Sequence, residues 1–385
     1  MRAIFLVRDN PSPPVNGYKK RNYYLVDYLK KGTGPLRGSV SNDVALVNGE
    51  LKKNIIQKVI IFISSLLSLV PFSVKIRTDN KVRQEIRQRC KENPVDLIIC
   101  DGIHRSLNIP FDVTGVKVLY EHNIEATIAG RYARLERNIF KKIFAYMEYL
   151  KFKLLQKKMW GKFNYCIACS DVDKKAIEAV VGEERVITVN NGVDLQYFSP
   201  GSYPVEANTL VYTGQIGWYP NEDGLVYFSE QILPVVKKIV PEVKLWIVGD
   251  RPSARIKSLA QRDNNILVTG FVDDVREFMG KASVYIVPLR IGSGTRLKIL
   301  EAMSMRKAIV TTSVGCEGLE VKDAEHLLIR DNPKDFAQAV IELLQDEGLR
   351  LKLGENGRRL VEEKYDWKVV FKSLGTVLGQ SEKCP

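Results

Sequence analysis

The feature that most constrains the fold is a series of short apolar runs, each bounded by turn-forming residues and separated from the next by a stretch of helical character. Runs this short have the length of strands, and their unbroken apolar character predicts burial on both faces. Such strands, alternating with helices, are typical of parallel sheets covered by helices on either side. The runs are Ala3–Val7, Leu97–Cys100, Lys117–Tyr120, Tyr165–Ala168, Leu210–Tyr212, Leu245–Val248, Ile266–Thr269, Val284–Val287 and Ala308–Thr311.

These runs fall into two series, which predicts an α/β chain with two doubly wound, Rossmann-like domains facing a central cleft. The length of 385 residues agrees with two domains, since one domain commonly takes about 100–200 residues. Turn formers cluster between the two series at Asn190–Asp194 and Ser199–Ser202. We therefore expect a first domain at 1–196, a second at 197–365, and a C-terminal helix at 366–385 that packs back toward the first domain.

The positive charge of the chain is confined to its first half. Residues 1–200 hold 33 Lys and Arg against 20 Asp and Glu, whereas residues 201–385 hold 25 of each. A basic domain attracts phosphate-rich partners: an anionic membrane, lipid-linked phosphates or nucleic acid. A well-solvated basic surface without such a partner is the alternative.

Two apolar segments of the basic half favour contact with a membrane surface. Val59–Phe72 is apolar but has only fourteen residues, and a span needs about 20. Arg137–Lys158 predicts an amphipathic helix with lysines opposite its apolar face, although inward packing of that face is the alternative. Because the N-terminus lacks the apolar stretch of a secretory signal, we expect a cytoplasmic protein, peripheral at the inner face of the cell membrane.

No metal or other cofactor is expected from the sequence. Cys166 and Cys169 form the one C-x-x-C pair, but residues three apart on a strand point to opposite faces and cannot share a metal ion. Asp171 and Asp173 spell D-x-D where a helix opens after a strand, so helix capping is the plainer interpretation.

The densest group of polar residues lies in Pro288–Met303. A strand gives way there to a loop with two glycines, and a helix is predicted to start near Thr295. The backbone N–H groups of such a helix start, together with Arg296 and Lys298, suit a diphosphate. Glu301 can accept hydrogen bonds from ribose hydroxyls. A glycine-mediated turn with surface basic residues is the alternative.

This block and several others together resemble the group 1 glycosyltransferases. The blocks of the second half are Thr213–Asn221, Trp246–Asp250, Thr269–Asp274 and Val314–Gly318, and those of the first are Tyr120–Glu125, Ala168–Asp171 and Val189–Asp194. The family consists of retaining enzymes of the GT-B fold, and the likeness is greatest to those that build bacterial exopolysaccharide and other surface glycans. The resemblance implies an acceptor-binding first domain and a second domain that binds a nucleotide-sugar donor.

The resemblance also implies roles for residues of the donor site. Glu301 corresponds to the second glutamate of the family's E-x7-E pattern, but the first falls on Ser293, so Ser293 and Gly294 would take over its contact with the sugar. Gln215 and Asn221 stand where the family commonly has Arg and Lys, which leaves Arg296 and Lys298 to neutralise the diphosphate. The other expected donor-binding residues are Gly214, Gly249, Gly270, Phe271, Val272 and Thr295.

In the first domain the resemblance points to His122, which follows the strand Lys117–Tyr120 and would contact the donor sugar or phosphate. Gly17 and Arg21 belong to the loop after the first strand and to the helix start behind it; in the family this glycine loop lies against the acceptor and the donor phosphate. His104 and His326, the remaining histidines, are weaker candidates.

The implied activity is transfer of a sugar from a UDP- or GDP-sugar to a glycan or lipid-linked acceptor, with retention of configuration and without a protein nucleophile. Two other functions compete with this prediction. A nucleotide-sugar 2-epimerase would use the same fold, but it needs acid and base side chains beside the sugar, of which His122 is the one good candidate. A nucleic-acid binder is prompted by the basic half, which lacks the aromatic-interleaved strands of RNA modules, so no nucleic-acid partner is expected.

Overall fold

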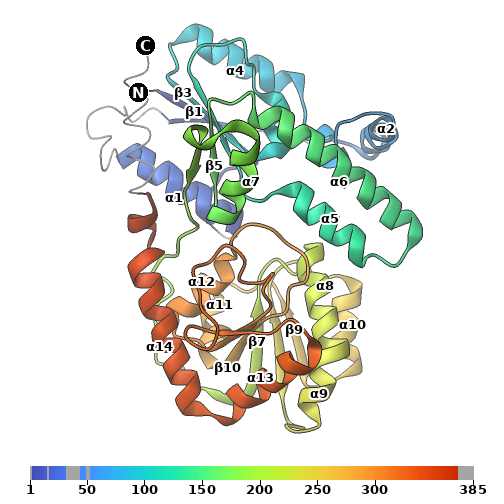
Figure 1. Ribbon diagram of the computed structural model, residues 1–385, viewed down its shortest axis with the longest axis vertical. Helices are drawn as coiled ribbons and strands as arrows, with labels where there is room; N and C mark the ends of the chain where they lie inside the picture. Colours follow the sequence, from blue (N-terminus) through green and yellow to red (C-terminus); the bar gives the residue numbers. More distant parts are fainter. Residues whose placement is uncertain (1, 15–16, 32–43, 49–52, 372–385) are drawn as a thin grey trace. The chain divides into compact units, whose positions relative to one another are not determined.

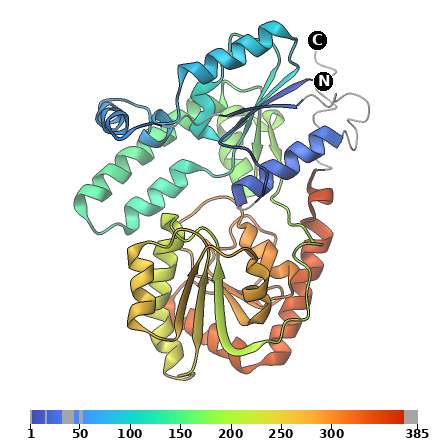
Figure 2. The same ribbon diagram turned by 180° about the vertical axis from the view of Figure 1, so that it is seen from behind.

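The computed structural model describes residues 2–14, 17–31, 44–48 and 53–371 of the chain. The chain divides into two compact units, the first made of Met1–Asn190 with Val370–Pro385 and the second of Asn191–Val369. Each unit has its own parallel sheet and its own hydrophobic core (Figures 1 and 2).

The sheet of the first unit has six strands in the order β2-β1-β3-β4-β5-β6, and every neighbouring pair is parallel. All residues of β1 and β3 are buried, as expected for central strands with helices on both faces. The strands are β1 (Ala3–Val7), β2 (Val44–Asn48), β3 (Leu97–Asp101), β4 (Val116–Tyr120), β5 (Tyr165–Ala168) and β6 (Val186–Thr188).

Helices lie on both faces of this sheet because the connections β1 to β2 and β2 to β3 run in opposite directions and crossovers are right-handed. Helices α5 and α6 form an antiparallel pair at one flank of the unit (Figure 1). The helical segments are α1 (Gly17–Lys31), α2 (Ile55–Leu66), α3 (Phe72–Lys75), α4 (Asn80–Glu92), η2 (Ile103–Asn108), α5 (Glu125–Leu135), α6 (Ile139–Trp160), α7 (Asp171–Val181) and η3 (Glu183–Arg185).

The second unit repeats this plan with a six-stranded parallel sheet in the order β12-β11-β10-β7-β8-β9. Its strands are β7 (Glu206–Thr213), β8 (Lys244–Val248), β9 (Ile266–Gly270), β10 (Ala282–Val287), β11 (Ile309–Thr311) and β12 (Leu328–Ile329). Its helices are α8 (Tyr219–Tyr227), the π-helical turn η4 (Phe228–Ile232), α9 (Leu233–Lys237), α10 (Ala254–Arg262), α11 (Val275–Lys281), α12 (Leu297–Ser304), α13 (Pro333–Gln345) and α14 (Glu347–Lys364).

Strand β7 contributes side chains to the hydrophobic clusters on both faces of its sheet. Leu210 and Tyr212 pack into a cluster on one face, while Val211 between them packs into a cluster on the other, because successive side chains of a strand point to opposite faces. From β7 the chain proceeds outward through β8 and β9, then returns to β10 on the other side of β7. The strand order therefore reverses between β7 and β10, which is where open α/β sheets bind ligands.

The predicted α/β class with two doubly wound units is confirmed, and each of the nine predicted runs belongs to a strand. Three strands were missed: β2, β6 and β12. Each of them is the outermost strand of its sheet and is only partly buried. β6 and β12 have only three and two residues, so their runs are too short to be recognised.

The predicted C-terminal helix falls mostly outside the described residues. Helical conformation extends from Trp367 to Phe371, and the ring of Phe371 stacks on that of Tyr28 in α1, with centroids 5.2 Å apart. Residues 372–385 lie outside the described part of the chain.

Glycines at the ends of β8 and β9 provide a test of the strand-end geometry. Gly249 and Gly270 both have positive φ, 144° and 72°. A Cβ atom on Gly249 would lie 1.7 Å from the carbonyl oxygen of Gly214, whereas one on Gly270 would meet nothing within 4 Å. Gly270→Ala should therefore cost only the backbone term of about 1–2 kcal/mol, and Gly249→Ala about 1–3 kcal/mol more through steric overlap. Calorimetric unfolding checks this difference; equal destabilisation by the two substitutions would contradict the geometry.

Candidate functional site

Three neighbouring strands of the second unit end in glycines that were predicted to bind the donor. Gly214 and Gly249 follow β7 and β8, and Gly270 is the last residue of β9. The N–H of Gly214 donates to the carbonyl of Val248 (3.0 Å), and that of Gly249 to the carbonyl of Gly270 (3.0 Å). This edge of the sheet is therefore bare backbone, which allows a ligand to approach the main chain closely.

The two residues after Gly270 differ in environment. The Phe271 side chain is 63 % exposed, whereas Val272 packs against the core cluster of its face. An exposed aromatic ring at a strand end can stack on a planar ligand.

The loop between β10 and α12 is held by its own polar contacts. Arg296 donates to the carbonyl oxygens of Ser293 and Gly294, the latter at 2.7 Å, and a Cβ atom on Gly292 would overlap its guanidinium group. The Asn191 amide donates to the Thr295 carbonyl (3.1 Å) and hydroxyl (2.5 Å). Ser293, Thr295 and Arg296 are all buried. The guanidinium group of Arg296 thus stabilises the loop. The sequence analysis had assigned this group to the diphosphate.

Lys298 lies where the strand order of the second sheet reverses. Its ammonium group is 3.7 Å from the centre of the Tyr212 ring and 3.3 Å from the Asn221 side-chain oxygen. It also lies 2.8 Å from where a Cβ atom on Gly214 would be. Burial lowers the pKa of Lys298 well below its ordinary value, and Arg296 adds to this effect while Glu301 opposes it. A bound anion would restore the favourable environment of the charged amine.

Glu301 lies one turn along α12 from Lys298 and hence on the same face of the helix. Its side chain is buried. Helix α12 begins at Leu297, two residues later than the predicted start near Thr295, so Glu301 is in its second turn. Lys298, which lies beside Gly214, and Glu301 form the polar surface at the start of α12.

Asn221 organises this surface and was not among the predicted site residues. The Tyr212 hydroxyl donates to its side-chain oxygen (2.6 Å), and its amide donates to the carbonyl of Gln215 (2.8 Å). In the sequence Asn221 stands out only as a departure from the family's basic residue. Its position in the first turn of the helix after β7 was the available signal.

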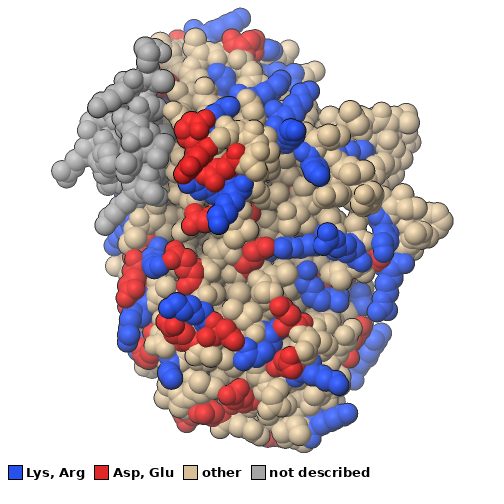
Figure 3. Space-filling view, in the orientation of Figure 1, with Lys and Arg blue, Asp and Glu red and all other residues tan. Residues whose placement is uncertain are grey.

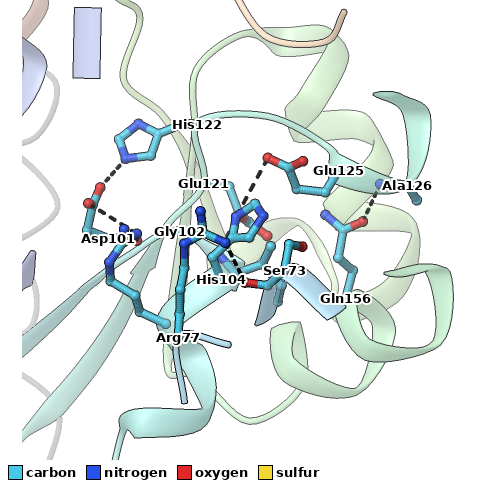
Figure 4. A network of polar contacts seen from close by, with 12 residues as sticks. Ser73, Arg77, Asp101, Gly102, His104, Glu121, His122, Glu125, Ala126 and Gln156 are labelled. Atoms are coloured by element: carbon cyan, nitrogen blue, oxygen red, sulfur yellow. Dashed lines mark hydrogen bonds and ion pairs between the residues drawn. The ribbon is translucent and has the colours of Figure 1, made fainter. Parts of the chain in front are cut away.

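In the first unit, His122 is held between two charged residues from other segments. Its Nδ1 atom lies 2.6 Å from the Arg21 guanidinium, and its Nε2 atom contacts the carboxylate of Asp101, the last residue of β3. Figure 4 shows the imidazole facing Asp101. An arginine can only donate, so Nδ1 accepts and the proton resides on Nε2, where it donates to Asp101. Burial lowers the pKa of His122, although Asp101 opposes this effect, so the ring is neutral.

Arg21 and Asp101 fix this tautomer. Arg21 lies one turn after Gly17 in α1, is only 2 % exposed, and also donates to the Cys169 sulfur (2.6 Å). Burial alone would raise the pKa of Asp101, but His122, Arg105 and a hydrogen bond from Tyr18 together lower it to about 2. Asp101 and Tyr18 were missed by the sequence reasoning; the position of Asp101 at a strand end was the signal.

A second polar cluster lies beside the first (Figure 4). His104 Nδ1 is 3.8 Å from a carboxylate oxygen of Glu125. Glu121 accepts from the Trp160 indole (2.8 Å) and from the Ile103 backbone (3.1 Å). Burial raises the pKa of Glu121 to about 8 and that of Glu125 to about 7, and it lowers the pKa of His104 well below its ordinary value. These groups are uncharged or close to their titration points at neutral pH.

The D-x-D sequence is part of a helix start, as predicted, but the capping residue is Ser170. Its hydroxyl accepts from the Asp173 N–H (3.1 Å) and donates to the Asp173 carboxylate (2.7 Å). Asp171 accepts from the Thr188 hydroxyl. Within residues 2–14, 17–31, 44–48 and 53–371, no group of three or more His, Cys, Asp or Glu is arranged to hold a metal ion.

Comparison with known proteins identifies the second unit. The family Glycosyl transferases group 1 matches residues 207–346, which run from β7 through α13. The chain carries a group 1 glycosyltransferase domain. It is therefore a glycosyltransferase, and the two doubly wound units of this glycosyltransferase are those of the GT-B fold.

Two relatives of this glycosyltransferase come from capsule systems. An uncharacterised 44.6 kDa protein in the cps region of Klebsiella pneumoniae is 24% identical over 324 residues, which cover 81% of this chain and 80% of that protein. The capsular polysaccharide biosynthesis glycosyltransferase CapM of Staphylococcus aureus is 25% identical over 232 residues, which cover 54% of this chain and 60% of CapM.

Solved structures share the fold over the whole glycosyltransferase chain. Sucrose-phosphate synthase of Thermosynechococcus elongatus superimposes with a TM-score of 0.75 at 16% identity, covering 99% of both chains. Anabaena HepE in complex with UDP-glucose gives a TM-score of 0.69 at 13% identity, covering 99% of this chain and 100% of that one.

The carboxyl groups of Glu121 and Glu125 predict a stability that depends on pH. Their raised pKa values mean that the folded state holds protons the unfolded state releases, so their stabilising contribution is complete below about pH 4.5 and is lost as pH rises through 7 for Glu125 and 8 for Glu121. Each group should remove about 1.4 kcal/mol of unfolding free energy per pH unit between those limits. In denaturant titrations from pH 5 to 9, Glu121→Gln should remove the loss of stability that continues up to about pH 8. Glu125→Gln should remove the loss that ends at about pH 7. An unchanged pH profile in both variants would contradict the assignment.

Proposed function

We propose that this glycosyltransferase moves a hexosyl group from a UDP- or GDP-sugar to a glycan or lipid-linked acceptor in the synthesis of a surface polysaccharide, with retention of configuration. The observation that carries the proposal is the Lys298 ammonium, which lies at the start of α12, beside Gly214, at the reversal of the strand order. The capsule-region relatives support the polysaccharide, and the HepE complex with UDP-glucose supports the class of donor.

Lys298 and α12 would bind the donor diphosphate. A helix start presents unpaired N–H groups and a partial positive charge, and Lys298 would add its charge there, because a bound anion favours the protonated amine. Glu301, one turn farther on, would accept hydrogen bonds from the ribose. Ser293 and Gly294 would face the sugar, and Arg296 would keep their loop in shape through its contacts with their carbonyl groups.

The acceptor reaction would proceed without a protein base. The acceptor hydroxyl attacks the anomeric carbon on the face from which the diphosphate departs, the bond between that carbon and the phosphate oxygen breaks, and the leaving phosphate takes the hydroxyl proton. Lys298 stabilises the charge that develops on the phosphate. His122 has both ring nitrogens engaged by Arg21 and Asp101, which suits a group that orients the sugar rather than one that exchanges protons. The 2-epimerase, which needs such exchange, is not favoured by the comparisons.

Nucleotide binding tests the donor site. Isothermal titration with UDP and with GDP should give binding of one nucleotide, and Lys298→Met and Glu301→Ala should each weaken it roughly 10- to 100-fold, the value of a hydrogen bond to a charged group. Lys257→Met on α10 and Glu342→Ala on α13, both exposed, are the matched controls and should bind as the wild type does. A folded chain that binds neither nucleotide would overturn the proposal.

Thermal unfolding distinguishes the two basic residues. Arg296→Met should destabilise the second unit by about 1.5–3 kcal/mol, because it removes charge-assisted hydrogen bonds to two carbonyl groups. Lys298→Met should leave the melting temperature unchanged or raise it, because it removes a charge that burial already disfavours. A larger loss of stability in Lys298→Met than in Arg296→Met would contradict these roles.

A further inference from the structure

Helix α2 has the opposite burial pattern from that of a packed helix. It consists mainly of Ile, Val, Phe and Leu, yet its one buried residue is Ser65. Ile56, Ile60 and Ile63 are 67%, 60% and 55% exposed. Exposed apolar side chains that occur singly are ordinary, but a contiguous set of this kind marks an interaction surface.

The exposed position of α2 is fixed by specific contacts. Its N-terminus carries a capping box formed by Asn54 and Gln57. At its other end the Lys151 ammonium group of α6 donates to the carbonyl of Ser65 (2.7 Å), and Lys75 donates to that of Ser64 (2.8 Å). Cations at the C-terminus of a helix satisfy its last carbonyl groups and its dipole. These contacts therefore hold α2 in place with its apolar side chains exposed.

Helix α6 continues the same apolar surface. Five of its side chains recur at helical spacing and are 44–60% exposed: Ile139, Ile143, Tyr146, Leu150 and Leu154. Its buried side includes the ion pair of Glu148 and Lys151. The sequence analysis predicted an apolar face on this helix, and most of that face is exposed. We call these five residues, with Ile56, Ile60 and Ile63, the α2–α6 face; in Figure 3 the flank formed by the two helices is mostly tan.

The exposed charges of the two helices all have one sign. Helix α2 has no acidic residue, and the only one of α6, Glu148, is buried. The exposed lysines are Lys58, Lys141, Lys142, Lys153, Lys157 and Lys158. An apolar surface bordered by lysines alone complements an anionic lipid surface, into which the apolar groups insert while the ammonium groups meet the headgroups. A second copy of the chain would bring the same positive charges against these.

We propose that the α2–α6 face docks the first unit on an anionic lipid bilayer, with α2 lying in the plane of the headgroups. No helix among the described residues is long and apolar enough to cross a membrane, and the docking requires none. This inference goes beyond the proposed sugar transfer, because it rests on the exposed surface of the first unit and not on the donor site.

Flotation of the full-length protein with vesicles tests the docking. The protein should float with phosphatidylcholine vesicles that contain phosphatidylglycerol and not with pure phosphatidylcholine, and added salt should weaken the binding. Ile56→Glu combined with Ile60→Glu should reduce the bound fraction at least tenfold. The matched control is Ile239→Glu combined with Leu351→Glu, since these residues of the second unit are 59% and 63% exposed; this control should bind vesicles as the wild type does.

Three results would overturn the docking: equal binding to both kinds of vesicle, equal loss in the control pair, or a lipid-free dimer in sedimentation that the α2 substitutions dissociate. Nucleotide titration of the same variants keeps the two proposals separate. The α2 variants should bind UDP or GDP as the wild type does, so a failure of lipid binding and a failure of the donor site are seen in different measurements.

Discussion

Parallel pairing of strands is the constraint on which the rest of the structure depends. Parallel strands need a crossover connection rather than a hairpin, so every strand of a sheet ends at the same edge and every connecting helix begins there. In the second unit this edge gathers Gly214, Gly249 and Gly270 with the start of α12, and in the first unit it gathers Asp101 with His122. This edge therefore brings together residues that are far apart in the sequence.

Both units bury ionisable groups, and the partners of these groups differ between the two units. In the first unit Arg21, His122 and Asp101 satisfy one another, so the imidazole is held neutral with a defined tautomer. In the second unit the Lys298 ammonium lies beside the Tyr212 ring and the Asn221 oxygen. Both ring nitrogens of His122 have a partner, whereas an arriving anion would favour the charged form of Lys298.

Polar groups in the first unit are used to place an apolar surface. The buried Lys151 and Glu148 hold the end of α2 and the backbone of Phe72, and the apolar side chains of α2 face outward. A docking surface built in this way is rigid before it meets its partner, so little conformational entropy is lost on binding.

The sequence by itself determined the fold class, the nine inner or strongly apolar strands, and the glycine-rich loop before α12, because local hydrophobic runs and turn residues act over a few neighbouring positions. Only the tertiary structure decided which side of each element faces solvent. The apolar pattern of α6 is equally compatible with inward or outward packing, and nothing local reveals that Glu148 and Lys151 are the buried side. The edge strands β2, β6 and β12, the hub at Asn221, and the turn of Arg296 toward its own loop likewise depend on partners distant in the chain. A hydrogen bond or a buried contact depends on two positions, and a single sequence does not show which distant positions come together.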